Sequence, residues 1–141
     1  MTPNQIRLIQ ESFAKVAPIS EQAAALFYGR LFEIAPQVQP LFRGDMKEQG
    51  RKLMATLATV ANGLSDLPSI LPAASALAKR HVAYGVKADD YAPVGDALLW
   101  TLERGLGAQW TPDVKAAWAT AYAVLAEYMI GEAYGRSAAA E

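Results

Sequence analysis

The stretch LFYGRLFEIAPQVQPLF, residues 26–42, sets the pattern that decides the fold. Apolar residues in and just before it recur at the three- or four-residue period of a helix buried along one face: Ala24, Phe27, Leu31 and Ile34. Pro36 predicts the end of this helix near Ala35, because proline disfavours helical geometry in the residue before it. The segment from Pro36 to Phe42 is too short for a full helix. We therefore expect a long helix followed by a short, proline-defined corner.

Helical periodicity continues in both directions from this stretch. Apolar residues recur with helical period in four further segments: residues 6–16, 53–64, 94–106 and 114–129. The sequence shows no strand-like alternation of apolar and polar residues and no hairpin signal. The proline-containing segment 65–73 predicts a broken entry into a shorter helix that ends at Gly85. We predict a single all-α domain over residues 1–141, with roughly six to eight helices and a frayed tail from residue 134 to 141.

Polar residues at the expected helix starts support these boundaries. Thr2, followed three residues later by Gln5, has the pattern of a capping box. Thr111 stands before the last apolar stripe and could cap that helix in the same way. Ser20 stands where it could cap the helix that contains residues 26–34. The starts of three helices are thus predicted from hydroxyl side chains.

The composition narrows the possible partners. The chain has 13 Lys and Arg, 14 Asp and Glu and a formal net charge of -1, without the basic clusters that nucleic acid requires. No apolar run approaches the roughly 18 residues of a membrane span, and the N-terminus lacks the pattern of a secretory signal. We therefore expect a cytoplasmic protein that neither binds nucleic acid nor crosses a membrane.

Missing residue types exclude most catalytic and metal sites. Without cysteine, the chain cannot form disulfides, thiolate metal sites, iron–sulfur clusters or a covalent haem link. The single histidine, His81, has no nucleophile beside it in the sequence, and one histidine cannot supply the usual zinc site. Phosphate-binding glycine motifs are also absent. We name no catalytic residue.

His81 itself has two interpretations. It lies in ALAKRHVAYGV, residues 76–86, in the last turn of an expected helix, where the helix dipole mildly favours a cationic imidazole. A histidine with no special role is the simpler interpretation. However, a metal carried in a large organic ligand needs only one protein donor, and a single histidine is enough to hold a haem.

A haem pocket would also need an aromatic side chain against the ring and polar groups beside the open face of the iron. Phe42 is a candidate for the first, and Tyr28 and Gln49 are candidates for the second. Each also has a plainer explanation: Phe42 as ordinary core, Tyr28 as a core tyrosine bonded to a carbonyl, and Gln49 as solvated surface. The haem propionates would lie at the rim of the pocket, where three cations are candidates to meet them: Lys52, Lys79 and Arg80. In the plainer interpretation these are solvated surface charges.

Five segments, taken in order, carry a resemblance to a known family. They are LFYGRLFEIAPQVQPLF, QGRKLMATL, LPSILPAASALAKRHVAYGV, YAPVGDALL and AAWATAYAVLAEYM. In this order and spacing, from about Gln5 to Tyr134, the sequence resembles bacterial single-domain haemoglobins and the globin module of flavohaemoglobins. The resemblance implies a globin fold around a haem b, iron protoporphyrin IX.

The resemblance also implies roles for individual residues. His81 matches the proximal ligand, which binds the iron through Nε2 while Nδ1–H donates to a carbonyl one turn back, that of Leu77. Phe42 matches the aromatic residue packed on the porphyrin, and Tyr28 and Gln49 match the polar positions on the opposite, distal face. The apolar pocket residues that it implies are Leu53 over the iron and, as walls, Val86, Val94, Leu98 and Leu125.

Two features depart from the family pattern. Flavohaemoglobin-type globins often carry a carboxylate on the last helix, paired with the proximal histidine and with a tyrosine at the position of Tyr91. Counting from Tyr122, that position falls on Ala133, and Glu132 comes one residue early, which turns it by about 100°. The second departure is that no reductase segment follows residue 141, so we expect any reductase to be supplied in trans.

The resemblance implies a five-coordinate ferrous haem that binds O2, CO and NO reversibly, with Tyr28 as the main donor to O2. Oxygen transport or storage by a monomer or homodimer is the first interpretation. Nitric oxide dioxygenation with a separate reductase is the enzyme alternative, so whether the protein is an enzyme stays open. Peroxidase activity, a sensor module and a haem-free all-α adaptor are further alternatives.

Overall fold

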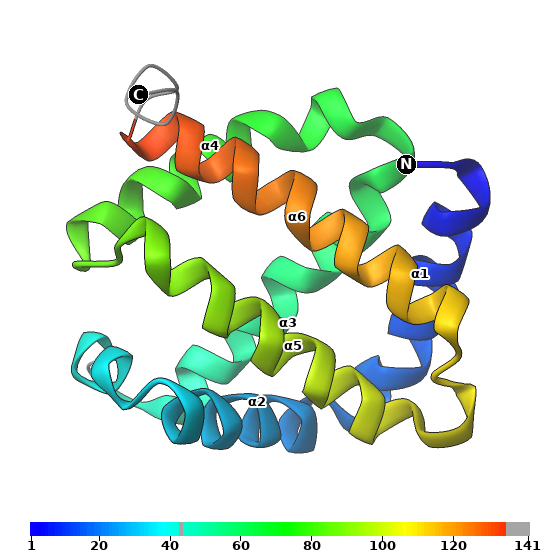
Figure 1. Cartoon of the computed structure of the whole chain (residues 1–141), viewed down its shortest axis with the longest axis horizontal. Helices are drawn as coiled ribbons and strands as arrows, with labels where there is room; N and C mark the ends of the chain where they lie inside the picture. Colours follow the sequence, from blue (N-terminus) through cyan, green and yellow to red (C-terminus); the bar gives the residue numbers. More distant parts are fainter. Residues whose placement is uncertain (43, 135–141) are drawn as a thin grey trace.

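The structure is a computed structural model that describes residues 1–42 and 44–134. Six α-helices account for most of these residues and are drawn in Figure 1: α1 (Pro3–Val16), α2 (Ser20–Ile34), α3 (Met46–Gly63), α4 (Leu67–Ala83), α5 (Tyr91–Leu106) and α6 (Pro112–Tyr134). Short 3-10 helices join them: η1 (Ala17–Ile19), η2 (Pro36–Leu41), η3 (Leu64–Asp66), η4 (Ala88–Asp90) and η5 (Gly107–Gln109). The predicted all-α architecture is confirmed for the described part of the chain. The predicted frayed tail falls beyond it, apart from Tyr134, which ends α6.

Most predicted helix boundaries match the structure. The capping box is present, since Thr2 Oγ1 accepts from the Gln5 N–H at 3.1 Å and Gln5 Oε1 accepts from the Thr2 N–H at 3.0 Å. Thr111 Oγ1 accepts from the Val114 N–H at 3.2 Å. The prediction for Ser20 was wrong: it is the first residue of α2, and no side chain caps this helix. The 3-10 turn η1 leads directly into α2 with helical backbone at Ser20, so the hydroxyl never stands outside the helix.

The helix that carries the histidine also differs from the prediction. α4 runs unbroken for 17 residues, although both Pro68 and Pro72 lie within it. Pro68 is in the first turn, where a backbone N–H has no intrahelical partner in any case. Pro72 removes only the bond to the carbonyl of Pro68, close to the helix start, so the later turns are unaffected. Gly85, with φ +97°, follows the end of the helix in the left-handed conformation that glycine adopts without strain.

The buried apolar side chains form two clusters. α2 packs along α5, α4 packs along α6, and α3 crosses behind α5 and α6 in the view of Figure 1. The larger cluster joins α1, α2, α5 and α6, and its most deeply buried large residues are Ile9, Val16, Leu31 and Leu102. The smaller cluster lies between α4, α5 and α6 and consists of Ala74, Ala78, Tyr91 and Met129. A domain of this size usually has one contiguous core with smaller satellite clusters, and here the satellite cluster is the one that lies beside α4.

We expect Ser12→Ala to lower the free energy of unfolding by about 1–3 kcal/mol. Trp118 Nε1 on α6 donates to Ser12 Oγ on α1 at 2.8 Å, and both side chains are buried. The substitution leaves the indole N–H buried without an acceptor. Urea unfolding followed by circular dichroism measures the change. Ser69→Ala removes an exposed hydroxyl and should stay within about 0.5 kcal/mol; equal losses in the two variants would contradict the assignment.

Candidate functional site

His81 lies half-buried in the last turn of α4. Its Nδ1 is 2.7 Å from the carbonyl oxygen of Leu77, one turn earlier, which confirms the hydrogen bond predicted from the sequence. Because a carbonyl can only accept, Nδ1 carries the proton in the neutral ring, and Nε2 keeps its lone pair. The helix therefore presents one oriented nitrogen that can coordinate a metal.

Two tyrosine rings lie beside His81. The ring centroids of Tyr84 and Tyr91 are each 6.4 Å from that of the imidazole; Tyr84 is 60% exposed, whereas Tyr91 is only 8% exposed. The Tyr91 hydroxyl is buried and has no hydrogen-bond partner within the described residues. A water or a ligand usually satisfies such an atom, because leaving it unbonded is costly.

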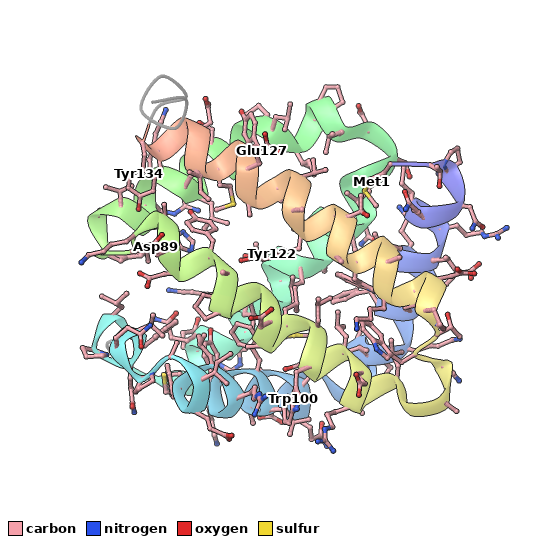
Figure 2. All side chains as sticks on the ribbon, in the orientation of Figure 1. Met1, Asp89, Trp100, Tyr122, Glu127 and Tyr134 are labelled. Atoms are coloured by element: carbon pink, nitrogen blue, oxygen red, sulfur yellow. The ribbon has the colours of Figure 1, made fainter. Side chains whose placement is uncertain are left out.

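How Tyr91 is held could not be predicted from apolar periodicity. Tyr122 on α6 donates its hydroxyl proton to the Tyr91 carbonyl over 2.6 Å, and Figure 2 shows Tyr122 in the space between the ribbons of α5 and α6. Gly95 makes room for this ring, because a Cβ at that position would lie 2.6 Å from Tyr122 Cε2. The signal was present in the sequence, since a glycine inside a helical pattern often marks a close approach.

Three predicted residues come together where α2, η2 and α3 meet. Tyr28 is buried, and its ring packs edge-on against that of Phe42, with centroids 5.2 Å apart and planes at 70°. The Tyr28 hydroxyl donates to the main-chain carbonyl of Gln49 over 3.2 Å. Phe42 and Gln49 are half-buried. This contact is the carbonyl bond that the plainer interpretation of Tyr28 predicts, and it involves the main chain of Gln49, not its side chain.

The predicted apolar pocket residues are divided between the two clusters. Those in or against the larger cluster are Leu53, Val94 and Leu98. Those against the smaller cluster are Leu77, Val86 and Leu125. All except Leu98 are half-buried, so the two clusters are edged by apolar surface that the helices leave partly open.

A small apolar cavity of about 10 Å³ lies between α1, α2, α3 and α5. Leu53 and Leu98 line it, together with residues of the larger cluster, whereas His81 does not. The cavity is therefore lined by neither Tyr28 nor His81.

Glu132 contacts α4 at Ser75, and no hydrogen bond joins it to His81 among the described residues. It is exposed and accepts hydrogen bonds from Ser75 Oγ at 2.9 Å and from the Tyr128 hydroxyl at 3.3 Å. Ala133 is half-buried and packs in the smaller cluster, which includes Tyr91. The helical phase predicted from the sequence is therefore confirmed: an alanine, and not a carboxylate, faces the cluster beside His81.

Stability is expected to fall steeply between pH 10 and 12, because burial raises the pKa of Tyr28 from 10.0 to about 12 and also raises those of Tyr122 and Tyr91. The unfolded chain releases these phenol protons first as the pH rises above 10, so proton release favours unfolding. Below pH 10 both states are protonated and the effect vanishes. Chemical denaturation at a series of pH values measures this. Tyr28→Phe should flatten the slope, whereas Tyr84→Phe, at an exposed position, should leave it unchanged; the reverse result would contradict the assignment.

Comparisons with known proteins agree with one family. The sequence model described as Globin matches residues 25–129. Proteins named Flavohemoprotein from Bordetella parapertussis and Bordetella bronchiseptica are each 33% identical to this chain, over 99% of its length and 36% of theirs. The chain thus spans about a third of the length of these curated relatives. The structure of a bacterial globin from Campylobacter jejuni is similar over 99% of this chain and 100% of that one, with a TM-score of 0.81 and 24% identity.

Proposed function

The chain belongs to the globin family, and from this premise we propose that it holds a haem b through His81 and binds O2, CO and NO reversibly, as a carrier or store of oxygen. Membership of the family supports haem and diatomic gases as ligands; the haem type and the oxygen role are the proposal. The observation that carries it is the 2.7 Å hydrogen bond from His81 Nδ1 to Leu77. This bond orients a nitrogen donor in a chain with one histidine and no cysteine.

The residues present fit a haem. A haem needs apolar surface on both faces, one nitrogen ligand and a polar contact on the side opposite that ligand. The half-buried apolar edges of the two clusters supply the surface, and His81 Nε2 would bind the iron. Phe42 would pack against the ring, and Tyr28 and Gln49 would line the opposite side.

When bound, a haem supplies a ferrous iron with one open position for a diatomic ligand. Tyr28 is protonated at neutral pH, as any phenol of pKa near 10 is, and burial raises its pKa to about 12, so it stays a hydrogen-bond donor well into alkaline solution. Gln49 is a half-buried residue of α3, and its side-chain amide would offer two further N–H donors. These two side chains would therefore select for ligands that accept a hydrogen bond.

The propionates of a haem would meet cations at the rim. Lys52 on α3 and Arg80 on α4 are exposed, and neither takes part in an ion pair among the described residues. Arg80 immediately precedes His81, so its long side chain starts beside the iron ligand. We propose that Lys52 or Arg80 meets the propionates.

Nitric oxide dioxygenation is the second candidate function, because the curated relatives named Flavohemoprotein extend well beyond the part that this chain matches. In this function a separate reductase would return the iron to the ferrous state. Ala133 weighs against it, since a carboxylate at that position would add negative charge on the His81 side. We propose the cytoplasm as the location for either function, because NADH-dependent reductases, which the dioxygenase would need, are present there.

Hemin titration followed by absorbance tests the haem assignment. A Soret band that saturates at equimolar hemin supports it, and a protein that takes up no hemin overturns it. Rapid mixing of the ferrous protein with O2 and NO, with and without an NADH-dependent reductase, then separates the two functions. Fast, sustained NO consumption only with the reductase identifies the dioxygenase, whereas reversible O2 binding with slow turnover identifies the carrier.

A further inference from the structure

Helices α2 and α3 cross in close contact at Ala24 and Gly50. Both residues are buried, and a Cβ at position 50 would lie 2.9 Å from the Ala24 Cβ, well inside the roughly 3.5–4.0 Å of a normal carbon contact. Gly50 does not have a positive φ, so this position requires space and not a special backbone conformation. A Cβ cannot move without its main chain. The glycine therefore sets how near α3 lies to α2.

The same crossing holds the Tyr28 hydroxyl to its acceptor. Tyr28 follows Ala24 by one helical turn and shares its face of α2, and Gln49 directly precedes Gly50 on α3. The bond from the Tyr28 hydroxyl to the Gln49 carbonyl spans 3.2 Å. Hydrogen bonds between a hydroxyl and an oxygen usually span about 2.5–3.0 Å, so a few tenths of an ångström of further separation would break it.

The phenol ring has little freedom to follow a displaced acceptor. Its centroid lies 5.1 Å from that of Phe27, 5.2 Å from that of Phe42 and 6.0 Å from that of Phe32. These rings fix the plane and position of the Tyr28 side chain. Whether its hydroxyl is bonded therefore depends on where the α3 backbone lies.

We propose that Gly50 is a positioning residue for Tyr28: by holding α3 against α2, it gives the phenol a main-chain acceptor and fixes the direction of its hydroxyl. The part that concerns gas ligands rests on the proposed function, whereas the part that concerns the hydroxyl does not. Gly50, which has no side chain of its own, would thus control the donor that Tyr28 offers to a ligand.

Gly50→Ala tests the proposal, because the new methyl group must push α3 away from Ala24. The pKa of Tyr28, which burial raises to about 12, is expected to fall toward 10, since the neutral phenol loses its acceptor and water gains access. Carbon-13 NMR of the full chain labelled at tyrosine follows this titration, with Tyr28→Phe to assign the signal. A folded Gly50→Ala protein with an unchanged Tyr28 pKa overturns the proposal.

Two variants control for a general effect of the added methyl group. Gly29→Ala makes the same change on α2, where a Cβ would meet nothing within 4 Å, and should leave the Tyr28 pKa unchanged. The double variant Ala24→Gly/Gly50→Ala moves the methyl group from one helix to the other and should restore the native pKa. If Gly50→Ala alone does not fold, the double variant carries the test, and a folded double variant with a shifted Tyr28 pKa contradicts the proposal.

The ligand part is tested in the haem-loaded protein by comparing Tyr28→Phe in two backgrounds. With Gly50 present, Tyr28→Phe should accelerate O2 dissociation roughly 5- to 30-fold. In the Gly50→Ala background, where the phenol gives up no carbonyl bond to reach the ligand, the acceleration should rise to roughly 10- to 150-fold. An equal acceleration in both backgrounds overturns control by Gly50. If Tyr28→Phe has no effect in either background, the proposed role of Tyr28 fails, and the NMR titration still decides the positioning of the hydroxyl.

Discussion

Replacing His81 by alanine is expected to weaken hemin binding by about 100-fold or more, which is about 2.8 kcal/mol at 1.4 kcal/mol per factor of ten. The imidazole belongs to the only histidine in the chain, and its Nε2 is oriented by the bond from Nδ1 to Leu77. Without it, a haem keeps only its apolar contacts with the two clusters and its contacts at the rim. Absorbance titration of the variant with hemin measures the loss.

Val82→Ala is the matched control for this variant. Val82 is the next residue on α4 and is 41% exposed, so truncating it should leave hemin affinity within a few-fold of the native value, about 0.5 kcal/mol. His81→Gly with added imidazole gives the complementary test, because the free base can fill the space of the missing side chain. Native hemin affinity in His81→Ala would show that another group holds the iron.

The helices could be predicted because their determinants are local. The capping box at Thr2 and the end of α2 before Pro36 depend only on neighbouring residues. The two errors also have local causes. Ser20 follows a turn that is already helical, and Pro72 lies so near the start of α4 that it disturbs a single backbone bond.

Within the site, contacts along one helix could be predicted and contacts between helices could not. His81 and Leu77 are four residues apart on α4, so helical spacing alone brings them together. The bond from Tyr28 to the Gln49 carbonyl depends instead on the distance between two backbones. A small residue at the crossing, Gly50, sets that distance, and no apolar period encodes it.

The smaller cluster bears on the choice between functions. With Ala133 facing the cluster that contains Tyr91, the observed acceptor for His81 Nδ1 is the neutral carbonyl of Leu77. A neutral acceptor transfers less negative charge to the imidazole than a carboxylate would, and extra charge favours bond-breaking chemistry at a bound ligand. This arrangement supports reversible binding over peroxidase activity.

Tyr28→Phe is expected to accelerate O2 dissociation from the ferrous protein. A hydrogen bond to a ligand that gains negative charge is worth about 1.5–3 kcal/mol, whereas the existing bond to the neutral Gln49 carbonyl is worth about 0.5–1.5 kcal/mol. The hydroxyl proton therefore rotates toward a bound ligand while the ring stays in place, and the carbonyl bond is given up. The net gain of about 1–2 kcal/mol corresponds to roughly 5- to 30-fold in rate. Rapid mixing of the oxygenated protein with excess CO measures the rate.

The size of this effect distinguishes the two interpretations of Tyr28. If its hydroxyl served only the Gln49 carbonyl, Tyr28→Phe would lower stability and leave O2 dissociation unchanged, because the proton would never reach the ligand. CO, which gains little charge on binding, should dissociate at nearly the native rate in either case, so the ratio of the O2 and CO effects isolates the hydrogen bond. Tyr84→Phe, at a 60% exposed position beside His81, controls for loss of a phenol elsewhere. Equal acceleration for O2 and CO would mean that the substitution opened the pocket, and that Tyr28 acts there as a wall and not as a donor.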